Sequence, residues 1–308
     1  MKKYKKLPKL IVILGPTASG KTELAIQLAK KFSGEIISAD SRQIYKGMNI
    51  GASKPSKDKG KGYKVEGVPH YLFDVVKPNQ SFTVAEYKNL ALKAIKNILK
   101  KGGVPILVGG TGLYIQAVVD NLKIPKIRPD QKLRKKLEAQ IKKSGLEKIY
   151  QKLIALDPEA AKFIDPKNPR RIIRALEVIL KTKKPFSSQR QKGRLLFDVL
   201  EIGLSKPKKN LEKRIEKRLM EQFNQGLVEE AEYLFKKYKK SPVLLSVIGY
   251  KEIAEYFQGK TTLQETFDLI NKNTQKYAKR QMTWFKKDKK INWIKSRKQA
   301  EKMVQKFL

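Results

Sequence analysis

Hydrophobic and polar residues in the first 120 positions follow two alternating patterns. Short continuous apolar runs at residues 10–14, 35–38 and 103–108 are typical of parallel strands, which are covered on both faces. Residues 83–101 instead carry apolar side chains every three or four positions, the spacing of an amphipathic helix. Because strands and helices alternate with short connections, we predict an α/β fold with a parallel sheet flanked by helices.

The pattern changes between residues 120 and 197. No strand-like run occurs there, and basic helical segments are separated by Asp-Pro and Asn-Pro pairs, which favour turns or helix starts. An apolar run at 195–204 then predicts a strand that returns to the sheet. We therefore predict an inserted all-helical domain at 120–197, within a core formed by residues 1–119 and 198–308.

Two long helical patterns, at 211–237 and 263–287, follow the returning strand. The segment between them contains Val247, Ile248, Gly249, Tyr250 and Lys251. The tyrosine could stack on an unpaired base or pack in the core, and the sequence leaves both open.

The loop after the first strand has a phosphate-binding pattern. Gly15, Gly20, Lys21 and Thr22 complete G-x-x-x-x-G-K-[ST] between the strand and a helix. Glycines let backbone N–H groups turn toward phosphate oxygens, the lysine adds a positive charge, and the threonine hydroxyl reaches Mg²⁺. A plain glycine turn is the alternative, but the complete motif in its strand–loop–helix context favours a di- or triphosphate site with Mg²⁺ at Thr22. The fold class is therefore a P-loop NTPase-like parallel sheet.

The composition is strongly basic. Lys and Arg number 69 against 29 Asp and Glu, which gives a net charge of +40. This charge favours polyanionic partners such as nucleic acid, although a lysine-rich compositional bias would produce the same number.

The composition and the apolar runs also bear on the cellular compartment of the protein. The chain has no cysteine, which excludes disulfides and thiolate metal sites and suits a reducing cytosol. Its apolar runs are shorter than the roughly 20 residues that span a bilayer, and the basic start leads directly into a strand rather than a signal peptide. We expect a cytoplasmic protein without membrane association.

Two polar residues follow predicted strands, where α/β sheets bind ligands. Asp40 could be a general base, although an N-cap or turn aspartate explains its spacing slightly better. Thr111 lies in a glycine-flanked loop, where it could contact a substrate or simply belong to a turn.

Several arginines are candidates for phosphate contacts. Arg214 and Arg218 share a helix face, and one of them could reach a pyrophosphate, although neighbouring glutamates could equally pair with them. Arginines also open a helix after Asn168 and Pro169, and Lys279, Arg280 and Gln281 lie late in another helix. Such side chains contact nucleic acid, but a solvated face is the alternative. His70 is the lone histidine, and we expect it to be packed rather than catalytic.

Seven sequence blocks occur in order over almost the whole chain. They are GPTASGKT at 15–22, ADSRQIYKGMNIGASKP at 39–55, LVGGTGLY at 107–114, NPRRIIRALEV at 168–178, KRIEKRLMEQFNQGLVEEAEYL at 213–234, VIGYKE at 247–252 and YAKRQMTWF at 277–285. Together they resemble the tRNA dimethylallyltransferase family of the bacterial type.

The resemblance implies transfer of a dimethylallyl group from dimethylallyl pyrophosphate to N6 of adenosine 37, beside the tRNA anticodon, in tRNAs that read codons beginning with U. It implies that Asp40 is the general base, that Thr111 contacts the target in the channel, and that Arg218 lies near the pyrophosphate. The implied pyrophosphate-binding residues are Gly15, Pro16, Thr17, Ala18, Ser19, Gly20, Lys21 and Thr22. The implied tRNA-binding residues are Asp40, Ser41, Arg42, Gln43, Thr111, Arg134, Arg170, Arg171, Ile172, Ile173, Arg174, Ser246, Val247, Ile248, Gly249, Tyr250, Lys251, Lys279, Arg280 and Gln281.

Mg²⁺ is the expected cofactor, and the tRNA anticodon stem–loop and dimethylallyl pyrophosphate are the expected partners of a monomer. One departure from the family pattern is Tyr71, which stands where a second histidine is often seen. From the residues alone, a small-molecule or nucleoside kinase is the main alternative, because a P-loop with an aspartate after the second strand also serves phosphoryl transfer. A non-enzymatic RNA-binding module that uses the loop as a switch is a third.

Overall fold

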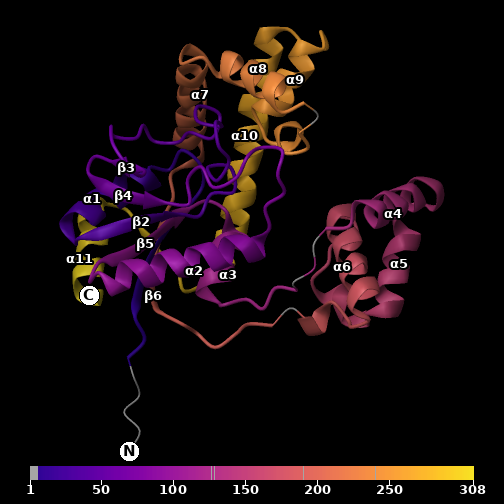
Figure 1. Ribbon diagram of the computed structural model, residues 1–308, viewed down its shortest axis with the longest axis horizontal. Helices are drawn as coiled ribbons and strands as arrows, with labels where there is room; N and C mark the ends of the chain where they lie inside the picture. The colour runs from indigo at the N-terminus through magenta and orange to yellow at the C-terminus, as the bar shows by residue number, and fades with distance from the viewer. Residues whose placement is uncertain (1–5, 126, 128, 190, 240) are drawn as a thin grey trace, which may run out of the picture. The chain divides into compact units, whose positions relative to one another are not determined.

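The computed structural model describes residues 6–125, 127, 129–189, 191–239 and 241–308, in two compact units (Figure 1). The sheet unit contains residues up to 119 and residues 196–308, and the helical unit contains residues 120–195. The first five residues of the basic N-terminal stretch lie outside this description. The predicted insertion extended to residue 197, but Phe197 packs in the core under the sheet, so the boundary lies two residues earlier.

The sheet unit is built on a mostly parallel sheet, so the predicted α/β class is confirmed. In the described part of the chain the strand order is β3-β4-β2-β5-β1-β6-β7, and β3 with β4 is the antiparallel pair. The strands are β1 (Lys9–Leu14), β2 (Gly34–Ser38), β3 (Lys64–Val65), β4 (Val68–Tyr71), β5 (Val104–Gly109), β6 (Asp198–Leu204) and β7 (Asn292–Ile294). Since β1, β2 and β5 are parallel neighbours, their carboxyl ends share one edge of the sheet.

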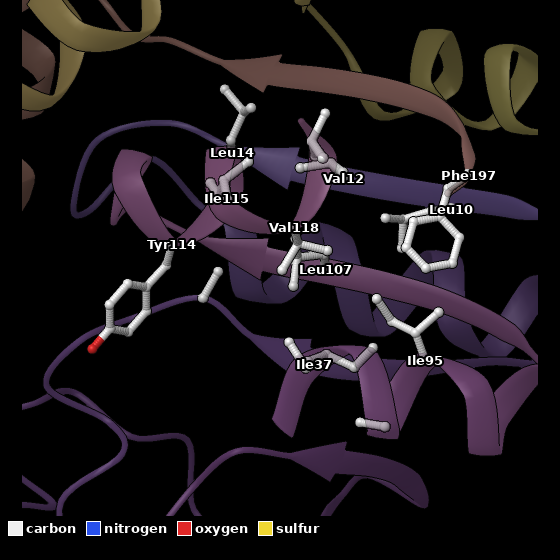
Figure 2. Close-up of a cluster of buried hydrophobic side chains, with 14 of the residues drawn as sticks. Leu10, Val12, Leu14, Ile37, Ile95, Leu107, Tyr114, Ile115, Val118 and Phe197 are labelled. Atoms are coloured by element: carbon white, nitrogen blue, oxygen red, sulfur yellow. The ribbon is translucent and has the colours of Figure 1, made fainter. Parts of the chain in front are cut away.

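Helices cover both faces of the sheet (Figure 1). On one face lie α2 (Val84–Lys100) and α3 (Gly112–Val119), and Figure 2 shows Val12 and Leu107 of the sheet among side chains of these helices. On the other face, α1 (Lys21–Lys31) and α11 (Arg297–Phe307) pack on a second cluster that includes Ile13. Burial on both faces is why the strands read as continuous apolar runs.

Four further helices of the sheet unit stand together in Figure 1. They are α7 (Lys208–Asn224), α8 (Leu227–Lys237), α9 (Tyr250–Phe257) and α10 (Leu263–Phe285), with the short turn η3 (Leu244–Ser246) before α9. The single helix predicted at 211–237 is wrong. Gly226 has φ of 93°, a left-handed conformation that glycine adopts readily, and it separates α7 from α8. The two helices therefore pack around a core of their own with α9 and the loop after β2.

The helical unit has its own apolar core. It contains α4 (Gln131–Ser144), α5 (Leu146–Leu156), α6 (Pro169–Thr182) and the short turns η1 (Pro158–Lys162) and η2 (Ser187–Gln189). Asn168 caps α6 by accepting a hydrogen bond from the Arg171 N–H, and Pro169 occupies the first turn. Both residue types are favoured at these positions, which is why the Asn-Pro pair predicts a helix start.

No helix within the described ranges of either unit is long and apolar enough to cross a membrane.

Candidate active site

The phosphate loop connects β1 to α1 with its backbone tightly curled. A Cβ on Gly15 would lie 2.3 Å from the Leu204 carbonyl oxygen, so glycine is required where the loop passes β6. Gly20 immediately precedes α1 and has φ of 98°, and no side chain caps the first N–H groups of the helix. Gln281 of α10 accepts a hydrogen bond from the Thr17 N–H at 2.8 Å and donates one to the Gly110 carbonyl. The loop is thereby tied to the end of β5, and its helix N-terminus is left available for an anion.

A cavity of about 90 Å³ lies at the carboxyl edge of the sheet. Its lining residues are Thr17, Lys21, Thr22, Ala25, Ile36, Ser38, Asp40, Arg42, Gln43, Gly51, Ala52, Ser53, His70, Phe73, Val108, Gly109, Arg218, Tyr277 and Gln281. The phosphate loop, Asp40 and Arg218, which are far apart in sequence, therefore share one cavity.

Asp40 lies in a turn, and its carboxylate also reaches the cavity. One carboxylate oxygen, Oδ1, accepts a hydrogen bond from the Arg42 N–H at 2.8 Å, as a turn aspartate does. Oδ2 has no hydrogen bond with any residue that the structure describes, and the side chain lines the cavity. One oxygen thus fixes the carboxylate, and the other can accept a proton.

Thr111 supports the loop that carries Asp40. Its hydroxyl accepts a hydrogen bond from the Ser41 N–H at 3.0 Å and lies 3.3 Å from the Ser41 hydroxyl. Its own N–H donates to the Ala39 carbonyl. Thr111 is not among the residues that line the cavity, so in this structure it contacts the Asp40 loop rather than the cavity itself.

Three cationic side chains line the cavity, and burial lowers the pKa of two of them, Lys21 and Arg218. Lys21 donates to the Pro16 carbonyl at 2.6 Å, and burial lowers its pKa to about 8, with Asp40 raising and Arg218 lowering that value. Burial, helped by Arg214, also lowers the pKa of Arg218 below its ordinary value. Arg218 makes no hydrogen bond or ion pair with another described residue. Desolvated cations without paired carboxylates favour an anionic ligand.

Arg214, the other arginine on this face of α7, has a different role. Its Nε donates to the Ala18 carbonyl at 2.8 Å and so contacts the backbone of the phosphate loop. Of the two arginines, Arg218 is the one that reaches the cavity.

The sequence analysis did not single out Phe73 and Tyr277, which line the cavity together with His70, and His70 is buried and packed as expected. The Arg42 guanidinium lies 4.6 Å from the centre of the Tyr277 ring, a cation–π contact that fixes Arg42 above the cavity. His70 and Phe73 pack ring edge to ring face, 5.6 Å apart, and Nε2 of the buried His70 has no hydrogen-bond partner among the described residues. Burial lowers the pKa of His70, although the Val68 carbonyl and Asp58 raise it. Tyr277 belongs to one of the quoted blocks, but no local pattern indicates that these rings share a cavity.

Comparison with known proteins identifies the chain's relatives. The family model described as IPP transferase matches residues 43–288. The chain belongs to this family. It is 46% identical over 289 residues to the tRNA dimethylallyltransferase of Acetivibrio thermocellus, covering 92% of this chain and 91% of that protein.

Solved structures of the family agree with the fold. The tRNA isopentenylpyrophosphate transferase of Bacillus halodurans is 37% identical, with a TM-score of 0.70 over 97% of this chain and 95% of that one. A eukaryotic dimethylallyltransferase described as acting on tRNA is 30% identical, with a TM-score of 0.73 over 90% of this chain and 69% of that one. Membership of the IPP transferase family makes this protein a prenyltransferase rather than a kinase or a non-enzymatic module.

The tRNA-binding residues implied by the family resemblance are not equally accessible. Arg170, Arg171, Ser246, Lys251, Lys279 and Arg280 are exposed, while Ser41, Arg42, Gln43, Val247 and Ile248 are half-buried. Tyr250 is fully buried in the core around α8 and α9, so packing, and not base stacking, explains this tyrosine. Ile172 and Ile173 are buried in the core of the helical unit, and Gly249 and Gln281 are also buried. The side chains of the buried residues cannot touch RNA in this conformation.

Arg134 and Arg174 are paired within the helical unit. Both donate to the carboxylate of Glu177, whose side chain is fully buried, at 2.8 Å and 2.5 Å. Burial raises the pKa of Glu177, but hydrogen bonds from Arg134, the Asp130 N–H and Arg174 outweigh it and hold the pKa below its ordinary value. These two arginines therefore stabilise the unit, and Arg170 and Arg171 are the ones left exposed.

Proposed function

We propose that this protein, as a monomer, transfers a dimethylallyl group from dimethylallyl pyrophosphate to N6 of adenosine 37 in tRNAs that read codons beginning with U, and releases pyrophosphate. The observation that carries the proposal is the shared cavity. Lys21 and Thr22 of the phosphate loop line it together with the Asp40 carboxylate and Arg218. An anion site and a proton acceptor in one cavity suit a displacement with a pyrophosphate leaving group.

Asp40 acts on the nucleophile. The lone pair of an adenine amino group is delocalised into the ring, which makes N6 a poor nucleophile. As the bond from N6 to the allylic carbon forms, the free oxygen of Asp40 accepts the N6 proton, which lowers the barrier.

The phosphate loop and the cavity cations act on the leaving group. As the bond from the allylic carbon to oxygen breaks, negative charge develops on the pyrophosphate. Lys21, Arg218 and the N–H groups at the start of α1 stabilise that charge. Arg218 needs to break no ion pair with a described residue in order to do so.

The residues at the cavity fit a magnesium ion that takes most of its ligands from the substrate. The Thr22 side chain is exposed and lines the cavity, and among the described residues no group of three or more His, Cys, Asp or Glu could bind a metal. Mg²⁺ characteristically keeps several waters and binds phosphate oxygens with few protein ligands. Thr22 would hold the ion, which would neutralise charge on the pyrophosphate.

The tRNA would be held by basic side chains of both units. Arg170 and Arg171 at the start of α6 and Lys279 and Arg280 late in α10 are exposed and suited to phosphate contacts. Adenosine 37 would leave its stack to reach the cavity, where Arg42 and Tyr277 lie beside Asp40.

A labelling assay tests this function. Wild-type protein with Mg²⁺, labelled dimethylallyl pyrophosphate and an anticodon stem–loop should label the RNA, and a stem–loop with guanosine at position 37 should stay unlabelled. A parallel reaction with γ-labelled ATP should transfer no phosphate. Failure to label any tRNA that carries adenosine 37 would contradict the proposal.

A further inference from the structure

The loop that follows β2 forms one wall of the cavity without regular secondary structure. Gly51, Ala52 and Ser53 of this loop line the cavity. Inside the loop, the Ser53 N–H donates to the Ile50 carbonyl and the Lys54 N–H to the Asn49 carbonyl. The buried Lys54 ammonium also donates to the Tyr45 carbonyl, to Asn49 and to Asp74. None of these contacts uses the N–H groups of residues 49–51, which find their acceptor on another element.

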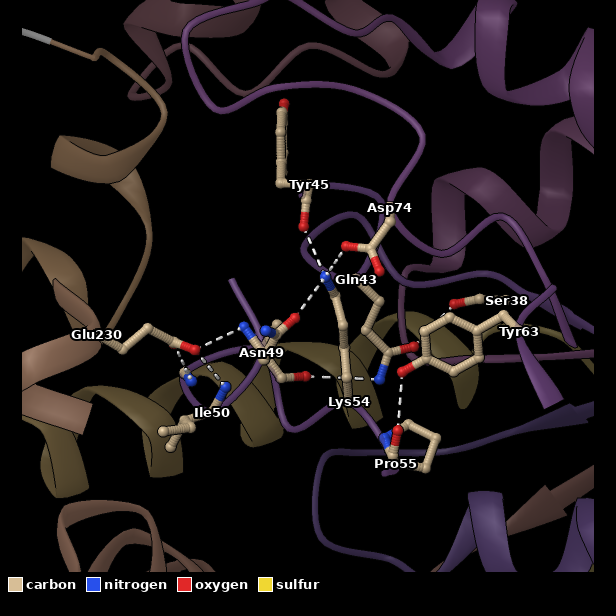
Figure 3. Close-up of polar contacts among 12 residues, drawn as sticks. Ser38, Gln43, Tyr45, Asn49, Ile50, Lys54, Pro55, Tyr63, Asp74 and Glu230 are labelled. Atoms are coloured by element: carbon tan, nitrogen blue, oxygen red, sulfur yellow. Dashed lines mark hydrogen bonds and ion pairs between the residues drawn. The ribbon is translucent and has the colours of Figure 1, made fainter. Parts of the chain in front are cut away.

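Glu230 of α8 supplies that acceptor. Its Oε2 accepts hydrogen bonds from the N–H groups of Asn49 and Ile50, both at 2.9 Å, and its Oε1 accepts one from Gly51 at 3.0 Å (Figure 3). Three successive N–H groups turned toward one carboxylate form an anion-binding concavity. Hydrogen bonds to a charged acceptor are roughly twice as strong as neutral ones.

The same carboxylate is held from its other side. The Tyr250 hydroxyl donates to Oε1 of Glu230 at 2.7 Å. The Tyr250 ring also packs against the loop, because a Cβ on Gly51 would lie 2.6 Å from ring atoms. Gln222 of α7 adds a second anchor by donating to the Ile50 carbonyl and to the Ser53 hydroxyl. The wall is thereby attached to α7, α8 and α9.

A chain of hydrogen bonds leads from this wall to Asp40. The Gln43 amide donates to the Ser53 carbonyl at 3.3 Å and accepts from the Ser38 hydroxyl at 2.8 Å. That hydroxyl in turn accepts a hydrogen bond from the Asp40 N–H at 3.3 Å. A displacement of residues 49–53 would therefore change the contacts that position the Asp40 backbone.

We propose that Glu230 is a positioning residue for the transfer reaction. It holds the wall at residues 49–53, and through Gln43 and Ser38 the backbone of Asp40, in the geometry that the reaction needs. This inference rests on the proposed function for its kinetic consequence, whereas its structural consequence can be measured without the reaction. Glu230 itself does not line the cavity.

The variant Glu230→Gln tests the inference. An amide has one acceptor oxygen, so it cannot accept hydrogen bonds from both sides as the carboxylate does. We expect kcat/KM for dimethylallyl pyrophosphate to fall by roughly 10²-fold, the cost of a small misplacement at a reacting centre. A rise in KM should contribute to this loss. Amide hydrogen exchange should accelerate in residues 46–54, while exchange in α8 stays at its wild-type rate.

Three further variants complete the experiment. Glu229→Gln changes the neighbouring, exposed glutamate of α8 and should behave as wild type. Tyr250→Phe removes one donor but keeps the three backbone hydrogen bonds, so exchange in residues 46–54 should stay slow. If Glu230→Gln does not fold, Gln222→Ala provides a second test, because it removes the hydrogen bonds to the Ile50 carbonyl and the Ser53 hydroxyl. It should accelerate exchange in the same segment with a smaller loss of kcat/KM.

The outcomes are separable. Wild-type exchange in residues 46–54 of Glu230→Gln, or a fall in kcat that only follows the folded fraction with KM unchanged, overturns the inference. Absence of transfer by the wild-type protein overturns the proposed function instead, and the exchange measurement still decides whether Glu230 holds the wall.

Discussion

Arg218 in the sheet unit and Arg134 in the helical unit are both half-buried arginines, but their surroundings are opposite. Burial lowers the pKa of Arg218, which has no ion pair with a described residue. Arg134 donates hydrogen bonds to the buried Glu177 carboxylate, and these outweigh burial and raise the pKa of Arg134. One cation is left for a ligand, and the other is neutralised within the fold.

This difference separates functional from structural basic residues in a chain with a net charge of +40. Unpaired, desolvated cations in a cavity cost free energy until an anion binds, so their presence there indicates a ligand site. Cations paired with a buried carboxylate indicate an ion-pair cluster that holds the helical unit together. We therefore expect substitutions in the two units to affect different measurements.

Among the basic residues and their partners, the largest effect is expected at Arg218. Arg218→Ala removes the cation that we propose stabilises the leaving pyrophosphate, and turnover should fall by about 10²–10³-fold, as when one preorganised donor is lost. Steady-state kinetics with saturating tRNA measures this loss. Lys217→Ala, an exposed neighbour on α7, should be neutral. An equal loss of turnover in Arg134→Ala would contradict the distinction between a ligand-binding Arg218 and a structural Arg134.

A smaller effect, on stability and not on chemistry, is expected at Glu177. Glu177→Gln leaves Arg134 and Arg174 without their carboxylate and should destabilise the helical unit by about 1–3 kcal/mol. Chemical denaturation measures this change, and Glu159→Gln, in an exposed pair of the same unit, should leave the midpoint unchanged.

The same carboxyl predicts a pH dependence. Because its pKa is lower in the folded protein than its ordinary value of 4.5, Glu177 contributes stability above about pH 4.5 that is lost as the pH falls through the folded-state pKa. In Glu177→Gln, the stability of the helical unit should therefore no longer show the part of the acid-induced decrease that comes from protonation of Glu177. An identical acid profile for both proteins would show that the ion pair does not stabilise the unit.

The smallest effect is expected at an exposed arginine. Arg171→Ala should weaken tRNA binding modestly and reduce the slope of log affinity against log salt by about 1, if its charge contacts one phosphate. A salt series of tRNA affinities measures the slope, with Lys143→Ala of α4 as control. If the affinity of the wild-type protein for tRNA did not change with salt, the basic surface would make no phosphate contacts and would reflect only a lysine-rich composition.

Features set by local chemistry were predictable from the sequence. The glycine-bounded loop at 15–22 predicted the turn from β1 into α1, and the apolar runs on β1 and β5 reflect burial on both faces. The Asn168–Pro169 pair predicted the start of α6 for the same reason. The break at Gly226 was missed because apolar spacing continues across it from α7 to α8.

Features that depend on distant partners could not be predicted. Tyr250 is buried against Gly51 and donates a hydrogen bond to Glu230. Arg134 is paired with Glu177, which is 43 positions away in the sequence. Neither contact leaves a periodic or compositional signal in one sequence. The cavity is the same kind of feature, since five or more separated segments line it.

Transfer by Asp40→Asn tests the central claim, that the cavity joins a proton acceptor to a pyrophosphate site, most directly. The asparagine oxygen can still accept the Arg42 N–H, so the turn is kept and only the proton acceptor is lost. Single-turnover transfer from dimethylallyl pyrophosphate to tRNA should slow by about 10²–10⁴-fold, with pyrophosphate and tRNA affinities unchanged. Transfer at the wild-type rate would contradict the account.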